Sequence, residues 1–452
     1  MVVQRVVAWR RWLRAMAVLR DVEESFATPT ERLQRVVNSL AVEMFAGLAS
    51  EDASKVRMLL TCVDSLPDVS EEGIYYAVDI GGTGFRFLKV QLGAGSTIIN
   101  QKIERQPVKK ELMKGTSEDF FNSIASTLKN FIEREGDEGR ALGFTFSFPI
   151  GQDVAQCLNE ALERNGLNLK VNALMNNTVG TLALGHYYDE DTIAAVIIGA
   201  GTNACYIERN EAITKCQCLL TNSGQTVVNV EWGSFCPPQI PLTPYDICFH
   251  NETPNYYDQG FEKMISGMYL GEIARLVFHK MAQESDVFGT DVDGLAIPFI
   301  LSTPCLAAIC EDDSLDLKEV GSILEEHLKI HNVPLKTRRL VQRVCDIITQ
   351  RAARLAAAGI VAILQKLGRD GTLCGTTRVR TMTGVPKRSV IAIEGGLYQE
   401  YSVFREYLNE AVLEILGEEI AATVVLKVVE EGSGLGAALI AAAYSSTRNN
   451  SI

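Results

Sequence analysis

Strands that run into glycine turns constrain the fold of this chain more than any other feature of its sequence. Residues 74–78 are apolar and lead into Asp79-Ile80-Gly81-Gly82-Thr83, after which residues 85–90 alternate between apolar and polar side chains. This pattern predicts two strands joined as a hairpin across the glycines. The layout recurs more loosely at residues 192–207, around GAGTN, and a strand at 390–393 enters a third glycine pair.

Helical periods fill the spaces between these strands. Apolar residues recur at helical spacing in residues 30–59, 261–269 and 344–355. The 452 residues are 47 % hydrophobic and 22 % charged, which is the composition of a globular protein. Strands interleaved with helices over this length predict an α/β protein with a bilobal body. Residues 367–387, rich in Gly, Thr and Arg, predict an exposed loop.

The charge balance and the cysteines exclude several classes of protein. With a net charge of −13, the surface as a whole does not attract a nucleic acid or an anionic membrane. The eleven Cys lack the spacing of a zinc site and predict reduced thiols in a cytoplasmic compartment. The longest apolar runs fall short of the ~20 residues that a membrane-spanning helix needs.

The N-terminal segment is the exception to this acidic balance. Residues 1–20 carry five Arg and no acid, and an apolar face recurs at helical spacing, formed by Trp9, Trp12, Leu13, Met16 and Leu19. This predicts a basic N-terminal helix over residues 1–21. Two roles remain open for it. It is either an ordinary helix docked on the body, or a segment that lies on a membrane surface or directs the protein to mitochondria or another organelle surface.

The glycine turns also have groups that could bind a phosphate. A glycine turn after a strand lets backbone N–H groups approach an anion, and the hydroxyl of Thr83 or Thr202 adds a donor for a phosphate oxygen. Asp79, just before the first turn, is placed to hold a Mg²⁺ that bridges phosphates. Together the turns favour a nucleotide cleft. Since neither GxxxxGK[ST] nor a GxGxxG between strand and helix is present, the phosphate cradle is of another kind.

Longer strings resemble those of the plant-type hexokinase family, over residues 10–444. They are DIGGTGFR at 79–86, FTFSFP at 144–149, NNTVGT at 176–181, GAGTN at 199–203, EWG at 231–233, FEKMISGMYLGE at 261–272 and GSGLGAA at 432–438. The resemblance implies a two-lobed, actin-like (ribonuclease-H-like) ATPase fold with a cleft between a small and a large lobe. The small lobe would hold residues 73–175 and 433–447, and the large lobe residues 22–72 and 176–432.

The resemblance also implies a reaction, the transfer of the γ-phosphoryl group of MgATP to the 6-hydroxyl of glucose or fructose in hexose metabolism. The sugar would be held by Ser147, Asn176, Asn203, Glu231, Gln259 and Glu262. Such groups suit a polyol, because amides and carboxylates accept hydrogen bonds from hydroxyls. ATP would meet Gly81, Gly82, Thr83, Arg86, Gly201, Thr202, Thr303, Gly432, Ser433 and Gly434, with Asp79 holding Mg²⁺ through the phosphates.

One departure from the family falls on its catalytic residue. The family has an Asp, which accepts the proton of the attacking hydroxyl, at the position of Asn177. An amide has no usable basicity, and losing a positioned base typically lowers the rate about 10²–10⁴-fold, on the order of 3–5 kcal/mol of barrier. We therefore expect phosphoryl transfer to be absent or very weak.

A second departure is a missing segment. In the family, a strand and loop ending in Trp-Thr-Lys-Gly-Phe follow FSFP and contact the sugar, whereas here Pro149 is followed within five residues by the next helix. Without this segment the small lobe should close poorly over a substrate. An error of gene prediction would leave the same gap. Smaller departures are Gly84, Ala200, Glu394 and the loop at 255–259.

Three functions remain open from the sequence. The first is an active ATP-dependent hexokinase of low turnover. The second, which Asn177 and the missing segment favour, is a hexokinase-like protein that binds a hexose or ATP and reports sugar status, and hence glucose homeostasis, to a regulatory protein partner. The third is a pseudoenzyme that binds neither ligand. A monomer is the default expectation.

Overall fold

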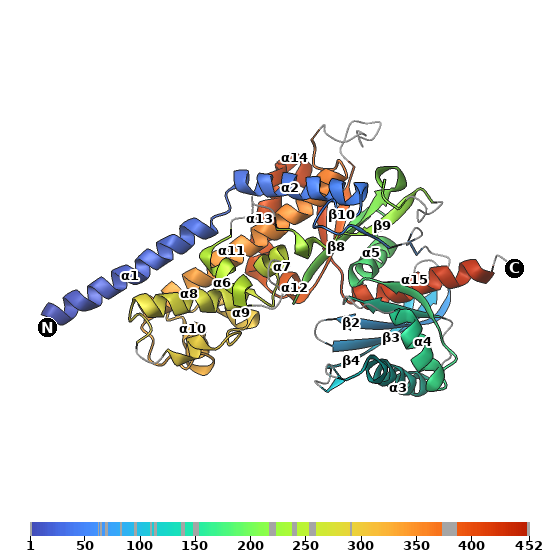
Figure 1. Cartoon of the computed structure of the whole chain (residues 1–452), viewed down its shortest axis with the longest axis horizontal. Coiled ribbons are helices and arrows are strands. Elements are labelled where there is room, and N and C mark those ends of the chain that lie inside the picture. Colours follow the sequence, from blue (N-terminus) through green and yellow to red (C-terminus); the bar gives the residue numbers. More distant parts are fainter. Residues whose placement is uncertain are drawn as a thin grey trace.

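Two sheets with flanking helices form the two lobes of the protein (Figure 1). The computed structural model describes residues 2–61, 63, 66–67, 71–81, 84–94, 97–108, 111–112, 115–136, 141–147, 153–216, 223–236, 242–252, 259–289, 292–372 and 387–449. For residues 2–10, 251–252 and 446–449 only the backbone is described.

The small lobe is built on a five-stranded sheet in the order β4-β3-β2-β5-β6. Its strands are β2 (Gly73–Gly81), β3 (Gly84–Gly93), β4 (Thr97–Gln106), β5 (Leu142–Phe146) and β6 (Val171–Met175). The predicted hairpin is confirmed, because Gly81 pairs with Gly84 across the first glycine turn. Alternate residues of β2 bury themselves against α3 (Ser117–Glu135) and α4 (Val154–Arg164) on one face of the sheet.

The large lobe repeats this topology in a sheet ordered β1-β9-β8-β7-β10-β11. The strands are β1 (Leu59–Leu60), β7 (Thr192–Ile198), β8 (Thr202–Arg209), β9 (Gln225–Asn229), β10 (Ser389–Glu394) and β11 (Val424–Val428). As in the small lobe, three antiparallel strands (β9, β8 and β7) are extended by two parallel ones (β10 and β11); the two-residue β1 adds a further antiparallel strand beside β9. The second predicted hairpin is therefore confirmed. The third glycine pair differs, since Gly396 opens the short helix α12 (Gly396–Gln399) instead of a second strand.

Two helices cross where the lobes meet. α5 (Asn177–Tyr188) follows the last strand of the small sheet, α15 (Gly432–Asn449) follows the last strand of the large sheet, and their side chains share one apolar core. A Cβ added at Gly436 would overlap the carbonyl oxygen of Gly180, and one at Gly180 would overlap that of Ser433. Glycine is therefore required here by close backbone approach.

The remaining helices of the large lobe surround α11 (Leu335–Lys366), whose run from Leu355 to Leu364 is almost completely buried. They are α2 (Thr30–Ala49), α6 (Pro244–Glu252), α7 (Gly260–Ile265), α8 (Leu270–Glu284), α9 (Thr303–Glu311), α10 (Lys318–Glu326), α13 (Ser402–Leu416) and α14 (Glu418–Ala421). Among the described helices, α11 alone is long and apolar enough to span a membrane, and 94 % of its apolar window is buried in the protein. In this fold it is the central core helix.

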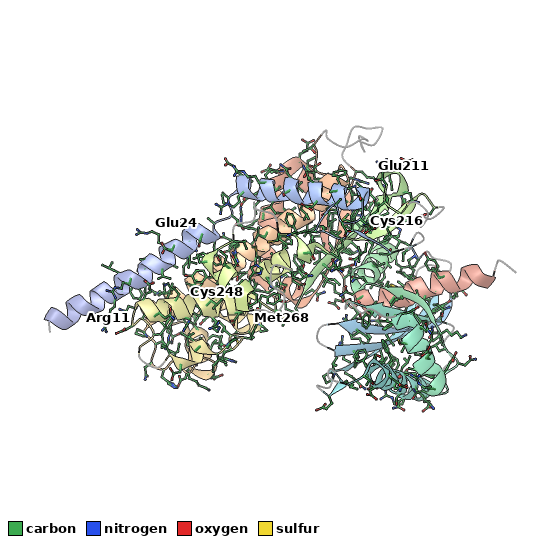
Figure 2. All side chains as sticks on the ribbon, viewed as in Figure 1. Arg11, Glu24, Glu211, Cys216, Cys248 and Met268 are labelled. Carbon is green, nitrogen blue, oxygen red and sulfur yellow. The ribbon has the colours of Figure 1, made fainter. Side chains whose placement is uncertain are left out.

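Two predicted helices end earlier than their periodicity suggests. The helix predicted over residues 30–59 stops at Ala49, because the chain then turns to pair β1 with β9. The helix predicted over residues 261–269 breaks after Ile265: the N–H of Gly267 donates to the carbonyl of Gly199 at 2.7 Å, and that of Met268 to Ala200 at 3.0 Å. The side chain of Met268 is exposed as a result (Figure 2).

The N-terminal helix α1 (Val2–Phe26) runs along and beyond the large lobe (Figure 1). Its C-terminal half is docked, since Ala15, Val18, Leu19, Val22 and Phe26 are buried in the main core. The face differs from the predicted stripe: Leu13 and Met16 are 45 % and 36 % exposed, and Arg11, labelled in Figure 2, pairs with Asp286. The docked-helix interpretation holds for the part whose side chains are described.

Candidate functional site

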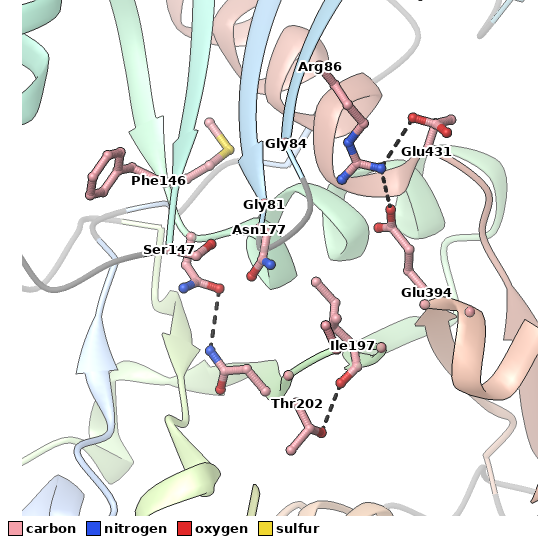
Figure 3. Close-up of a pocket in the computed structure, with 18 of the residues that line it drawn as sticks. Gly81, Gly84, Arg86, Phe146, Ser147, Asn177, Ile197, Thr202, Glu394 and Glu431 are labelled. Carbon is pink, nitrogen blue, oxygen red and sulfur yellow. Dashed lines mark hydrogen bonds and ion pairs between the residues drawn. The ribbon is translucent and has the colours of Figure 1, made fainter. Parts of the chain in front are cut away.

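A cleft of about 1920 Å³ opens between the two sheets, at the ends of the strands that carry the glycine turns (Figure 3). Pockets for one small ligand usually measure about 300–1,000 Å³, so this one has room for two. Eleven of the predicted site residues line it: Gly81, Arg86, Ser147, Asn176, Asn177, Gly201, Thr202, Asn203, Glu231, Gln259 and Glu262. The fold thus gathers residues that lie up to 181 positions apart in the sequence.

A closed amide–carboxylate network forms one wall of the cleft. The side-chain N–H₂ of Asn203 donates to Glu231 Oε1 and to Asn229 Oδ1, both at 2.8 Å, and Asn229 in turn donates to Glu231 Oε1 at 2.8 Å. The backbone N–H of Glu231 donates back to Asn203 Oδ1 at 3.0 Å. Asn229, which the motif comparison missed, therefore fixes the rotamers of two predicted sugar ligands.

The backbone is strained at two of these ligands. Glu231 has φ 55° and Gln259 has φ 61°, a left-handed conformation that is uncommon for residues other than glycine. Each residue immediately precedes a short helix, and Trp232, which follows Glu231, is fully buried and donates its indole N–H to Thr202 Oγ1 at 3.1 Å. The buried residues that follow, Trp232 and Phe261, anchor the two strained residues, whose side chains line the cleft, and such strain is common at binding sites.

Glu262 is a buried carboxylate of the same wall. Its Oε2 accepts a hydrogen bond from the backbone N–H of Thr202 at 3.0 Å. Burial raises the pKa of this carboxyl, and the neighbouring charge of Glu231 acts in the same direction, although the hydrogen bond from Thr202 opposes both.

Ser147 presents an unsatisfied hydroxyl. Its Oγ is buried and has no hydrogen-bond partner within the part of the chain that the structure describes. A buried polar atom without a partner requires an explanation, because leaving it unpaired costs about 1–3 kcal/mol. A ligand hydroxyl in the cleft would satisfy it.

Asn177 is the first residue of α5, and Figure 3 shows its side chain at the cleft. Its Oδ1 accepts from the backbone N–H of Thr178 at 2.9 Å. Asn176 caps the helix, and its Oδ1 accepts from the same N–H at 3.0 Å and from Thr178 Oγ1 at 2.8 Å. The carbonyl end of Asn177 is thus engaged with its own helix, and its amide N–H₂ is left to the cleft.

An ion-pair cluster occupies the other end of the cleft (Figure 3). Arg86 on β3 pairs with Asp79 on β2, with Glu394 at the end of β10 at 3.5 Å, and with Glu431 before α15 at 3.3 Å. Arg105 on β4 also pairs with Glu431. Burial raises the pKa of Glu394, although Arg86 and the hydroxyl of Thr181, at 2.6 Å from its Oε2, oppose that shift.

The predicted phosphate and metal contacts differ from what the structure shows. The Thr202 hydroxyl donates to the carbonyl of Ile197 at 2.9 Å, so it is not free to donate to a phosphate. Asp79 is fully buried and does not line the cleft; its carboxylate contacts Arg86, Thr145 and Ser433. For Asp79 to contact Mg²⁺ directly, its ion pair with Arg86 would have to break. Within the described residues no cluster of three or more His, Cys, Asp or Glu could hold a metal.

Four predicted nucleotide contacts do not line the cleft. The hydroxyl of Thr303 is buried and accepts from the N–H of Gly271 at 3.3 Å. Gly432 and Gly434 allow α15 to pack against α5 and β3, and the N–H of Ser433 donates to Glu394 Oε2 at 2.9 Å. Here these residues hold elements together. Gly82, Thr83 and the predicted gap at 150–152 lie outside the described residues.

Backbone donors do remain at the second glycine turn. The N–H groups of Ala200 and Gly201 have no hydrogen-bond acceptor in the described part of the chain, and both residues line the cleft. Gly81 faces open space, since a Cβ added there would meet nothing within 4 Å. Such turns suit a phosphate chain, because backbone N–H groups bind anions.

Two sheets of matching topology, crossed by α5 and α15 and separated by a polar cleft, define the two-lobed, actin-like ATPase fold. Two family models, each described as Hexokinase, match the chain, one at residues 193–443 and the other at 18–153 and 150–187. The chain therefore belongs to the hexokinase family, in its plant-type branch.

The relatives support this assignment. The chain is 73 % identical to "Hexokinase-10" of Oryza sativa subsp. japonica, over 99 % of this chain and 94 % of that protein, and 44 % identical to "Hexokinase-1" of Arabidopsis thaliana. Among solved structures, the hexokinase of Schistosoma mansoni in complex with glucose superposes with a TM-score of 0.84 at 28 % identity, covering 95 % of this chain and 99 % of that one.

The same comparisons agree with a missing segment after Pro149. One family model matches in two pieces that meet at residues 150–153. The alignment with the rice relative spans 473 positions, which is more than the 452 residues of this chain, so at least 21 of those positions have no residue here.

Proposed function

We propose that this hexokinase-family protein binds a hexose and MgATP in its cleft, transfers the phosphoryl group slowly or not at all, and acts mainly as a sugar-binding, sugar-sensing protein. The observation that carries the proposal is Asn177. Its side chain stands where the family places a proton acceptor, and its Oδ1 already accepts from Thr178. An amide in that arrangement cannot take the proton of the 6-hydroxyl.

Sugar binding is supported by the opposite wall. Asn203 and Glu231 are pre-oriented by Asn229, Glu262 is held by the N–H of Thr202, and Ser147 has an unsatisfied hydroxyl. A polyol satisfies such groups without rearranging them, which lowers the entropic cost of binding. The site is therefore suited to bind sugar even though its proton acceptor is replaced.

Nucleotide binding is supported by the glycine turns. The N–H groups of Ala200 and Gly201 and the open face of Gly81 suit the phosphates, and Arg86 supplies a cation at the same end of the cleft. When bound, ATP with its divalent metal supplies an activated γ-phosphoryl group. The residues of the cleft would orient that group and the sugar.

The test is calorimetric titration of the purified chain with glucose, with and without MgATP, together with glucose-dependent ADP release. We expect glucose to bind and turnover to be about 10²–10⁴-fold below that of a related hexokinase assayed in parallel. Asn177→Asp should raise turnover, whereas Asn177→Ala should not. Turnover within tenfold of the related enzyme would refute the proposal, as would the absence of glucose binding.

A second candidate is an active hexokinase of low turnover. The 73 % identity to a relative named "Hexokinase-10" favours it. It predicts product formation well above a no-enzyme background, with a rate that Ser147→Ala lowers. If the protein only binds and reports sugar, glucose should bind without this Ser147-dependent formation of product.

A further inference from the structure

We infer that Trp232 is the positioning residue of the wall that binds sugar, because its indole joins the three backbone segments that carry predicted sugar ligands. These ligands are Glu231, Asn203 and Glu262. Trp232 is fully buried and does not line the cleft, so its effect on a sugar passes through the segments that it joins. The inference rests on the proposed sugar binding and deepens it by naming the residue that sets the affinity.

The indole N–H fixes the segment that carries Asn203. It donates to Thr202 Oγ1 at 3.1 Å, and this hydroxyl in turn donates to the carbonyl of Ile197 at 2.9 Å. The backbone N–H of Thr202 donates to Glu262 Oε2 at 3.0 Å. A displaced Thr202 would therefore move Asn203, which follows it in the chain, and would also weaken its own hydrogen bond to Glu262.

The indole ring packs against the segment that carries Glu262. The ring of Phe261, the residue before Glu262, meets the indole edge to face, with 5.8 Å between the ring centroids. On the side of α11, a Cβ added at Gly359 would lie 2.9 Å from Cζ3 of the indole, so the glycine leaves the room that the ring needs. The indole thus lies between Phe261 and the central core helix, and close packing there fixes the residue that follows Phe261.

Burial of the indole also maintains the strained backbone of Glu231. Its φ of 55° is a conformation that persists in a residue other than glycine only when the surroundings hold it. Asn203 and Asn229 bind the end of its side chain, whereas Trp232 anchors its backbone from the next position. Without the indole, we expect this backbone to relax and the carboxylate to move away from Glu262, whose charge it repels.

The experiment is calorimetric titration of the full chain and its variants with glucose. Trp232→Phe keeps an aromatic ring against Phe261 but removes the N–H, and Thr202→Val removes the hydroxyl that accepts from it. We expect each variant to bind glucose about three- to tenfold more weakly. Because both break the same hydrogen bond, the double variant should be no more than about twofold weaker than either single one. Thr202→Ser keeps the hydroxyl and should restore binding to within about twofold of the unsubstituted protein.

Trp12→Phe is the matched control. Trp12 is a half-buried indole that packs on the same core from α1, with Lys336 Nζ 4.7 Å from its ring centroid, and it does not line the cleft. The same substitution there should change glucose affinity less than about twofold. Thermal unfolding of each variant, with titrations made well below every melting temperature, separates a loss of affinity from a loss of folded protein.

The outcomes separate this inference from the proposed function. Unchanged glucose affinity in folded Trp232→Phe overturns the inference alone, and so do losses that multiply in the double variant, because the two side chains then act separately. If Trp232→Phe does not fold, Thr202→Val and Thr202→Ser decide, and equal affinities overturn the inference. An unsubstituted chain that does not bind glucose overturns the proposed function and the inference with it.

Discussion

Ionisation of the Glu262 carboxyl is expected to lower the stability of the fold but to favour sugar binding. Because burial raises the pKa of its carboxyl, the folded protein holds this proton more strongly than the unfolded chain does. The stability that comes from the protonated form is fully present below the unfolded pKa and is lost as the pH rises through the folded pKa. Ionisation of Glu262 therefore costs stability as the pH rises, and we expect the carboxylate form to be the one that accepts hydrogen bonds from sugar hydroxyls.

We predict that Glu262→Gln raises the melting temperature at pH 7 by roughly 1 °C, a gain on the order of 1 kcal/mol in a chain of 452 residues, and lowers glucose affinity about tenfold. The amide oxygen of Gln can still accept from Thr202, so the fold loses no hydrogen bond. Scanning calorimetry from pH 4 to 8 gives the check. The gain should vanish near pH 4, and a gain that is constant with pH would contradict the role of ionisation.

Single residues show where sequence reasoning succeeds and where it stops. Ser147, Asn176 and Glu231 could be assigned because each lies in a distinctive string, and all three line the cleft. Asn229 could not, since an Asn within a strand carries no signal until the β8–β9 register sets it opposite Cys205 and near Asn203. Thr202 lines the cleft as expected, but Asp79 does not, and the partners of both side chains depend on tertiary contacts that no local pattern encodes.

At the level of elements, the crossing of α5 and α15 depends on two glycines. A methyl group at Gly436 would overlap the carbonyl of Gly180. We predict that Gly436→Ala lowers the free energy of unfolding by about 1–3 kcal/mol or more, because the helices must separate. Urea unfolding followed by tryptophan fluorescence measures this.

Gly396→Ala is the matched control for that substitution. A Cβ there would lie 3.5 Å from Glu400, which is an ordinary contact. Its effect should stay within about 0.5 kcal/mol. Equal losses for both variants would show that the crossing tolerates a side chain.

The elements themselves follow from periodicity, but their ends do not. The two glycine hairpins were predictable because alternation and Gly-Gly turns are local signals. The break between α7 and α8 was not, because residues 266–269 leave the helix to bond with the turn at 199–200, far away in sequence. The docked face of α1 was predicted only in part: Leu19 and Trp12 meet the core as expected, but Leu13 and Met16 are exposed.

For the whole molecule, we expect the missing segment to limit catalysis independently of Asn177. We predict that inserting the corresponding segment of rice Hexokinase-10 between residues 149 and 153 tightens glucose binding but leaves turnover low. Combined with Asn177→Asp, it should raise turnover by more than the product of the two single effects, because closure and proton transfer act in one step. Steady-state ADP release on the four proteins tests this coupling. If Asn177→Asp alone matches the combined variant, closure does not need the segment.

The cluster around Arg86 has a consequence for any anion that enters the cleft. One guanidinium is shared by Asp79, Glu394 and Glu431, and Glu431 is also the partner of Arg105. A phosphate that approaches Arg86 would compete with these carboxylates for the guanidinium, so we expect anion binding there to involve an exchange of counter-ions. If the carboxylate displaced were Glu394 or Glu431, an ion pair between the strands of the small lobe and the end of β10 or the segment before α15 would be lost, so anion binding at Arg86 would weaken the contact between the two lobes.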